Sequence, residues 1–336
     1  MTLRMVVALI SLCAIAAVPG DISKFRAVTF AKPTPLARND QLIRRLFSPF
    51  AAADLARANA STALRDFPID PRDEKFGLYV PSEKPARGYA LLVWVSPLDG
   101  AGMPPGWAPI LERSGVIFVT AARSGNLTSP MGRRFPLALI AAANVPRHYP
   151  VDPNRIWIAG FSGGSRIAER LALAYPDVFS GAILDGSSDN IGSTDVPLPA
   201  RVNYERFLDR TAIVLSSGEK DPVNVDSAWK VASSLRRRCF GRLSVEVRRR
   251  EEHVMMNGKS LANAIEFLDR KRSEPSPSDR QCREKLYSKI DGELAQAEAL
   301  VRRHGHSARG AIRSIDRRYG WLAAPRSLDL LARAGS

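Results

Sequence analysis

The chain has 336 residues, 45% of them apolar, and its 49 Lys and Arg against 34 Asp and Glu give a formal net charge of +15. This length suits one large α/β domain with an appendage or two smaller domains, and the apolar fraction excludes a chain disordered throughout. The charge is compatible with nucleic acid, an anionic surface or an acidic substrate. No zinc-ligand spacing, aromatic RNA-binding signature or single basic helix accompanies it, so we expect no nucleic-acid partner. A solvated, arginine-rich surface is the simpler interpretation, and peripheral contact with anionic surfaces is the alternative.

Residues 1–20 have the pattern of a secretory signal peptide. Arg4 supplies a positive charge, and Met5–Ala17 form an almost unbroken apolar run that ends in small residues suited to cleavage. The run is short for a membrane span, and the bulky Leu12 before Cys13 disfavours a lipoprotein signal. We therefore expect an exported protein, periplasmic or secreted, with an uncleaved N-terminal anchor as the alternative.

Residues 21–70 form a mixed N-terminal extension without a chemical motif, with helical runs expected around Asn39–Phe47 and Pro49–Arg57. A regular alternation then fills residues 71–270. Strands are expected at Phe76–Val80, Ala90–Val95, Val116–Thr120, Arg155–Phe161, Ala182–Leu184, Ala212–Leu215 and Ser244–Val247. Helices are expected at Trp107–Arg113, Leu137–Val145, Ser165–Tyr175, Asp226–Arg237 and Lys259–Asp269. This alternation predicts a mostly parallel sheet with helices on both faces.

The stretch Arg155–Ala168 is the most informative in the chain. It has the pattern of an apolar strand, the turn Gly160-Phe161-Ser162-Gly163-Gly164 and a helix. This order is typical of the nucleophile elbow of an α/β-hydrolase, in which a strained strand-to-helix turn exposes a serine hydroxyl. Gly160 and Gly164 lack the side chains that would clash where strand and helix approach each other. An inert glycine-rich turn is the alternative.

A serine nucleophile needs a base, and in this fold the base follows the serine and the acid in the chain. Of the four histidines, His148 precedes Ser162 and is out of order. His253 follows the last predicted strand of the sheet, at an edge where ligand chemistry is found in open α/β sheets. His304 and His306 lie in the C-terminal region, where a solvated loop is the simpler interpretation than a metal site. His253 is therefore the predicted base.

The acid should lie on a loop after a strand between Ser162 and His253. The segment Thr211–Pro222 provides a strand, a glycine turn and two carboxylates, Glu219 and Asp221. Asp221 is preferred because the following Pro222 can expose its side chain at the edge of the sheet. Glu219, which could instead be solvated or paired with Lys220, is the fallback, and Asp185 is a weaker rival because its strand comes earlier than the usual acid position.

Beyond residue 270 the character of the sequence changes. Residues 271–280 are rich in Ser, Pro and charge and predict a linker, and residues 281–336 predict a small helical appendage. Removal of the signal segment leaves Cys239 and Cys282, and an exported protein with two cysteines favours a disulfide between the sheet domain and this appendage. Two separately buried thiols are the alternative.

Several segments together resemble the polyhydroxybutyrate depolymerase and feruloyl esterase-like group of α/β-hydrolases. They are Asp152–Arg155, Gly160–Gly164 and Tyr175–Phe179, with Gly218–Asp221 and Glu252–Val254 resembling the acid and histidine loops of that group. The resemblance covers roughly residues 75–270. It implies an α/β-hydrolase fold in which Ser162 is the nucleophile, Asp221 the acid and His253 the base. It also implies ester hydrolysis through an acyl-enzyme, without a metal or an organic cofactor.

The chain departs from that group after the strand that ends at Val95. Relatives of this kind usually carry a His-Gly pair there, whereas this chain has Ser96-Pro97-Leu98-Asp99-Gly100. Pro97 has no N–H to donate, so we predict that the backbone N–H groups of Gly163 and Leu98 bind the oxyanion, with Pro97 as a rigid hinge. The alternative is a half-built site, and the loss of one such donor costs about 2.7–4 kcal/mol of transition-state stabilisation.

The predicted function is an exported serine esterase acting on a small or polymeric ester. A serine peptidase or amidase on the same fold and a catalytically weak hydrolase fold kept for binding are the alternatives, because nothing in the sequence specifies the substrate or the oligomeric state. Five apolar residues could line an acyl pocket but are more often core residues: Trp94, Met103, Trp107, Trp157 and Phe161.

Overall fold

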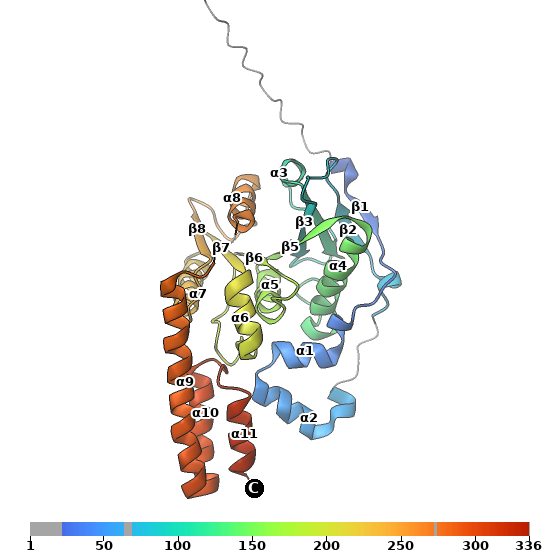
Figure 1. Cartoon of the computed structure of the whole chain (residues 1–336). Coiled ribbons are helices and arrows are strands. Elements are labelled where there is room, and N and C mark those ends of the chain that lie inside the picture. The colour runs from blue at the N-terminus through green and yellow to red at the C-terminus, as the bar shows by residue number, and fades with distance from the viewer. Residues whose placement is uncertain (1–21, 64–68, 272–273, 336) are drawn as a thin grey trace, which may run out of the picture.

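A computed structural model describes residues 22–63, 69–271 and 274–335 (Figure 1). The predicted signal peptide, residues 1–20, lies outside these residues. The centre is an eight-stranded sheet in the order β1-β2-β4-β3-β5-β6-β7-β8. The strands are β1 Arg26–Val28, β2 Phe76–Tyr79, β3 Tyr89–Val95, β4 Val116–Ala121, β5 Val151–Phe161, β6 Gly181–Asp185, β7 Ala212–Gly218 and β8 Leu243–Arg248. β3 to β8 are mutually parallel, and β2 runs antiparallel to both of its neighbours.

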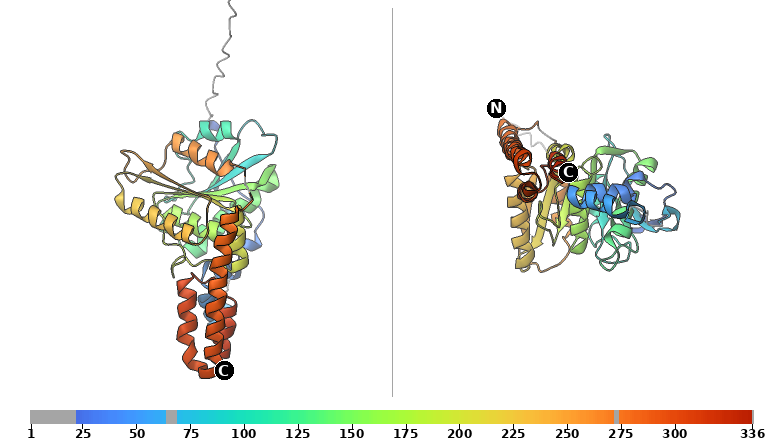
Figure 2. Two further views of the ribbon diagram at one scale, coloured as in Figure 1. Left: turned by 60° about the vertical axis from the view of Figure 1, so that its left-hand side comes forward. Right: turned by 90° about the horizontal axis from the view of Figure 1, so that it is seen from below.

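Helices cover both faces of the sheet, as the alternation predicts (Figure 2). The helices of residues 22–271 are α1 Asn39–Leu46, α2 Pro49–Ala63, α3 Ala108–Ser114, α4 Phe135–His148, α5 Gly163–Ala174, α6 Arg201–Arg210, α7 Pro222–Arg237 and α8 Gly258–Asp269. Helices α3 and α8 contact each other and cover one face, while α4, α5 and α7 pack on the other. The fold class predicted from the sequence is confirmed.

The alternation of side chains along the strands divides the core into two layers. In β3, Leu91, Val93 and Val95 belong to the layer under α4 and α5, and Leu92 and Trp94 to the layer under α3 and α8. The second layer also contains Trp107, Trp157 and Phe161, all buried. These aromatic residues are core residues, as the simpler interpretation of the sequence has it.

The N-terminal extension is part of the sheet domain. β1 pairs with β2 at the edge of the sheet, and α1 packs against α5. Arg45 on α1 forms a 2.7 Å ion pair with Asp177, and its guanidinium lies 4.5 Å from the centre of the Tyr175 ring. Helix α1 therefore packs against α5, the helix that follows Ser162, and against the residues just after it.

The C-terminal residues form three helices, α9 Pro277–His304, α10 Arg309–Arg318 and α11 Arg326–Arg333, which pack together and project beyond the sheet (Figure 2). α9 begins inside the predicted linker, where Ser276 and Asp279 form a capping box. Short helical turns complete the described chain: Ile22–Lys24, Pro35–Ala37, Pro71–Asp73, Pro130–Arg134 and Gly305–Ala308. No helix in the described ranges has both the length and the apolar character that a membrane crossing requires.

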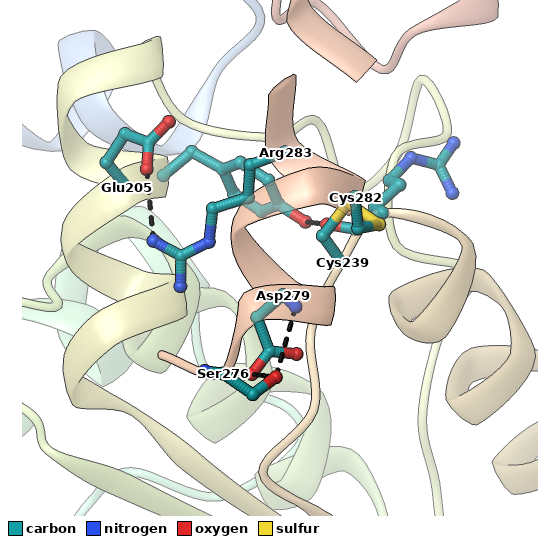
Figure 3. The surroundings of a disulfide bond; sticks show 8 residues. Glu205, Cys239, Ser276, Asp279, Cys282 and Arg283 are labelled. Carbon is teal, nitrogen blue, oxygen red and sulfur yellow. Dashed lines mark hydrogen bonds and ion pairs between the residues drawn. A yellow bond between two sulfur atoms is a disulfide. The ribbon is translucent and has the colours of Figure 1, made fainter. Parts of the chain in front are cut away.

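A disulfide joins Cys239, just after α7, to Cys282 on α9 (Figure 3). The two Cα atoms lie 5.7 Å apart, within the normal range for a disulfide. Next to it, Arg283 forms ion pairs with Glu205 and Asp209 of α6. The predicted bridge between the sheet domain and the appendage is confirmed, and the alternative of two separate thiols is wrong.

Candidate active site

Ser162 stands at the turn between β5 and α5, in a backbone conformation that few residues other than glycine adopt. Its φ and ψ are 53° and −123°, and a residue held in such a region stores about 1–3 kcal/mol of strain. A Cβ on Gly160 would lie 2.3 Å from the carbonyl carbon of Gly164. A side chain at position 160 would therefore clash where β5 and α5 approach each other, as the sequence analysis predicts. The Ser162 N–H donates to the carbonyl of Asp185 on β6 at 2.9 Å, which ties the turn to the neighbouring strand.

The His253 side chain lies directly against Ser162. It comes from the loop between β8 and α8, and its Nε2 is 3.0 Å from Ser162 Oγ. Its ring packs against Phe161, with 4.8 Å between the ring centres. Ser162 is half-buried and the His253 side chain is 41% exposed, so a substrate can reach both groups.

Asp221 lies on the loop between β7 and α7, on the far side of the imidazole. Its Oδ2 is 2.6 Å from His253 Nδ1 and accepts a second hydrogen bond from Asn224 Nδ2 at 2.7 Å. Burial raises the pKa of Asp221, but the hydrogen bonds from Asn224 and His253 outweigh it, and the pKa lies below its ordinary value. Asp221 therefore carries a negative charge that orients His253 through Nδ1 and leaves Nε2 facing the serine.

The other two carboxylates considered from the sequence serve elsewhere. Glu219 accepts the backbone N–H of Arg250 at 2.8 Å. Asp185 is fully buried, forms a 2.6 Å ion pair with Arg248 and accepts the N–H of Met256 at 2.7 Å. Because Arg248 and Met256 flank the loop that carries His253, these bonds hold that loop at both ends.

The two predicted oxyanion donors differ in whether another group of the protein already accepts their N–H. Gly163 is the first residue of α5, so its N–H precedes the first intrahelical hydrogen bond and lies beside Ser162. The Leu98 N–H, the second predicted donor, instead donates to Ser96 Oγ at 2.9 Å. The sequence analysis missed this because a serine hydroxyl two residues earlier can capture the N–H in a local turn. Pro97 links its loop to the loop after β4, because its carbonyl accepts the N–H of Asn126 at 2.9 Å.

The remaining histidines lie away from this site. His148 ends α4, His304 ends α9, and His306 lies in the turn Gly305–Ala308 between α9 and α10. Within residues 22–63, 69–271 and 274–335, no group of three His, Cys, Asp or Glu side chains is placed to hold a metal ion. Asn224, which the sequence analysis overlooked, is the third residue after Asp221 in the first turn of α7, and this spacing is the signal that could have revealed it.

The strand order, the antiparallel β2 and the serine elbow after β5 define an α/β-hydrolase fold.

No protein-family model and no curated protein matches the chain. Among solved structures, the BES protein from Bacillus cereus is 12% identical, with a TM-score of 0.46 over 62% of this chain and 94% of that chain. A thermostable esterase is 19% identical, with a TM-score of 0.43 over 74% and 63% of the respective chains. A feruloyl esterase module from Clostridium thermocellum is 11% identical, with a TM-score of 0.44 over 60% and 85%. The fold assignment rests on the chain's own sheet order and elbow.

Proposed function

We propose that this protein is a serine hydrolase that cleaves carboxylic esters through a covalent acyl-enzyme on Ser162. The observation that carries the proposal is the continuous contact from Ser162 Oγ to His253 Nε2 at 3.0 Å and from His253 Nδ1 to Asp221 Oδ2 at 2.6 Å. A nucleophile, a base and an acid in this order are what acyl transfer at neutral pH requires. The segments that resemble polyhydroxybutyrate depolymerases and feruloyl esterases support the same chemistry.

In this mechanism, Ser162 Oγ attacks the ester carbonyl carbon while its proton passes to His253 Nε2. The carbonyl oxygen becomes an oxyanion, which the Gly163 N–H stabilises, and Asp221 stabilises the protonated imidazole. Collapse of the tetrahedral intermediate breaks the bond to the alcohol, which leaves with the proton from His253. A water molecule then attacks the acyl-enzyme by the same route and releases the carboxylic acid.

The surroundings of the triad favour an ester with an apolar part. Four large apolar side chains next to the site loops are exposed: Leu98 (66%), Leu127 (99%), Val223 (76%) and Val254 (47%). Val223 and Val254 follow Asp221 and His253 within two residues. All four lie on loops that follow strands of the parallel sheet or in the first turn of the next helix, where ligands bind in open α/β folds. We therefore expect esters of apolar acids to be better substrates than acetates.

We further propose that the protein is exported, to the periplasm or beyond the cell. The disulfide supports this location, because such bonds form and persist in oxidising compartments. Intact-mass measurement on protein from the native host should find a chain that begins near Ala17 to Asp21. A cytoplasmic chain that retains residues 1–20 would contradict the proposal.

Hydrolysis of p-nitrophenyl esters with acyl chains of two to eight carbons tests the activity. We expect Ser162→Ala to abolish turnover, whereas Ser233→Ala, a change of an exposed serine on α7, should leave it unchanged. A peptide p-nitroanilide series run in parallel tests the peptidase alternative. Peptide hydrolysis without ester hydrolysis, or ester hydrolysis that survives Ser162→Ala, would contradict the esterase proposal.

A further inference from the structure

The loop after β4 brings a side-chain amide to the elbow that the triad does not use. A Cβ built on Gly163 would lie 2.3 Å from Oδ1 and 3.0 Å from Nδ2 of Asn126. The Asn126 amide therefore occupies the space where any larger residue after Ser162 would place its side chain. Asn126 is exposed, and in the described part of the chain its side-chain amide has no hydrogen-bond partner. A polar group left unpaired beside a nucleophile is available to a ligand.

Hydrogen bonds fix the backbone of this loop to the loop after β3. The Asn126 N–H donates to the Pro97 carbonyl at 2.9 Å, and the Arg123 N–H donates to the Asp99 carbonyl at 2.7 Å. The Asp99 side chain accepts the Gly125 N–H at 2.8 Å. The two loops therefore form one unit, and the amide of Asn126 is held by its backbone while its polar atoms stay free.

A buried guanidinium contacts both loops, the one after β3 and the one after β4. Arg134, at the start of α4, is only 4% exposed and donates to the carbonyls of Ser124 and Ser96 at 3.0 and 3.1 Å. Ser96 opens the loop after β3, and Ser124 lies in the loop after β4. If either loop moved away, the buried guanidinium would lose a hydrogen-bond partner, which is costly for a charged group. The two loops are therefore held in a defined position relative to each other.

We propose that the side-chain amide of Asn126 is the second oxyanion donor, together with the Gly163 N–H. This inference rests on the proposed function. In this fold the second donor comes from the loop after β3, but here the Leu98 N–H of that loop is bound to Ser96 Oγ. The amide of Asn126 lies over the first residue of α5, and a half-turn of its side chain exchanges Oδ1 and Nδ2, so the N–H₂ group can face the substrate carbonyl. It donates a hydrogen bond and transfers no proton.

This role explains why the residue after the nucleophile is glycine. A side chain at position 163 would displace the amide, whereas glycine leaves the space next to residue 163 to the Asn126 amide. A donor that acts only on the developing oxyanion stabilises the transition state more than the bound ester. Its loss should therefore lower kcat and leave KM nearly unchanged.

Steady-state hydrolysis of p-nitrophenyl butyrate by the full chain tests the proposal with three variants. We expect Asn126→Ala to lower kcat about 100-fold. Asn126→Asp should lower it further, because its carboxylate would face the oxyanion. Asn154→Ala, a change of an exposed asparagine near the opposite end of β5, should match the wild type. Melting curves confirm that all three variants are folded.

Inhibition by a trifluoromethyl ketone, which forms a tetrahedral adduct with serine, gives a readout that a purely structural role would not reproduce. Affinity for this inhibitor should fall by the same factor as kcat in Asn126→Ala, while KM changes less than threefold. A kcat within threefold of wild type in Asn126→Ala overturns the proposal and leaves the esterase intact. If the wild-type chain hydrolyses no ester, the proposed function fails and this inference fails with it.

Discussion

Asp221 shows how the environment of one residue defines a chemical role. Its carboxylate loses solvation on burial, which raises its pKa, but the hydrogen bonds from Asn224 and His253 have the larger combined effect and lower it. The carboxylate consequently stays ionised at and below neutral pH. An ionised acid keeps the Nδ1 proton of the imidazole directed at itself and, in the proposed mechanism, stabilises the imidazolium.

Replacement of Asn224 tests this arrangement. Asn224→Ala removes the 2.7 Å hydrogen bond to Asp221, so the pKa of Asp221 should rise towards its ordinary value and its carboxylate should become less well oriented. We expect kcat/KM at neutral pH to fall roughly 10-fold, which corresponds to a loss of about 1.4 kcal/mol. Ester hydrolysis kinetics, with Asn154→Ala as the control, measure this loss. An unchanged kcat/KM would show that Asn224 has no part in orienting the acid.

The three residues of the proposed triad can be picked out from the sequence because their signals are local. Ser162 lies in a five-residue motif between a strand and a helix, and His253 is the one histidine of the four that lies between the last strand and the last helix of the sheet domain. The oxyanion side of the site has no such signal. Whether the Leu98 N–H is free depends on one Ser96 rotamer, and the position of Asn126 depends on contacts between two loops. Both are properties of packing, not of a motif.

At the scale of the elements, the loop between β8 and α8 depends on a buried ion pair. Arg248 at the end of β8 pairs with Asp185 of β6 and also donates to the Val254 carbonyl, next to His253. Burial raises the pKa of Asp185 to about 6, although Arg248 and the Met256 N–H act in the opposite direction. The pair is therefore ionised at neutral pH, and it fixes the histidine loop.

Removal of the cation from this pair should destabilise the fold and do so most at high pH. In Arg248→Met the Asp185 carboxylate is left buried without its partner, a change that typically costs about 3–5 kcal/mol. Its pKa should rise further above 6, so the loss of stability should be smaller at pH 5, where the group is protonated, than at pH 8. Urea unfolding at the two pH values measures this difference. Equal losses at both would mean that Asp185 is not the source, and the double variant Asp185→Leu, Arg248→Met should recover part of the loss.

The C-terminal helices contain a second buried carboxylate. Asp316 on α10 is fully buried, and no hydrogen bond to its carboxylate oxygens is present in the described part of the chain. Burial raises its pKa to about 6. The folded chain therefore favours the protonated form, and ionisation reduces stability progressively as the pH rises from about 4 to about 6.

Asp316→Asn should stabilise the protein at pH 7–8 and not at pH 4. The neutral amide avoids the ionisation penalty, which we place at about 1–3 kcal/mol above pH 6, and its own buried donors offset part of that gain. Melting temperatures at pH 4 and pH 8 give the comparison, with the exposed Asp329→Asn of α11 as the control. A variant that is less stable than the wild type at pH 8 would rule out an uncompensated carboxylate at this position.

Two elements, β1 and α6, could not be predicted from the sequence, and each has a physical reason. β1 has three residues, none buried, and takes part in the sheet only through pairing with β2. α6 carries only three buried residues, Tyr204, Phe207 and Leu208, in an otherwise polar segment. In contrast, β3, β4, β6, β7 and the second half of β5 are mostly apolar and buried on both faces, and such runs indicate a parallel sheet strongly.

At the scale of the whole molecule, the disulfide joins a projecting helical bundle to the domain that carries all three residues of the proposed triad. The cysteines are 43 residues apart in sequence. The bundle packs beside α6, whereas Ser162, Asp221 and His253 lie on loops at the carboxyl ends of β5, β7 and β8. The bridge should therefore contribute to stability without a direct effect on the chemistry.

Cys239→Ser with Cys282→Ser should lower the free energy of unfolding by about 3–4 kcal/mol, the loop-entropy value for a closed loop of this size. Hydrolysis well below the melting temperature should keep the wild-type kcat. Dithiothreitol should lower the melting temperature of the wild type and leave the double variant unaffected. A large fall in kcat at 25 °C in the folded double variant would instead show that the bundle acts on the active site.

Covalent labelling of the protein by a fluorophosphonate tests the central claim most directly, because it requires an activated serine and no knowledge of the substrate. The account predicts one adduct per chain, mapped by mass spectrometry to Ser162, absent in Ser162→Ala and strongly slowed in His253→Ala. His148→Ala, a change of an exposed histidine at the end of α4, should label at the wild-type rate. Labelling of another residue, or labelling of Ser162 at full rate without His253, would contradict the assignment of the nucleophile and its base.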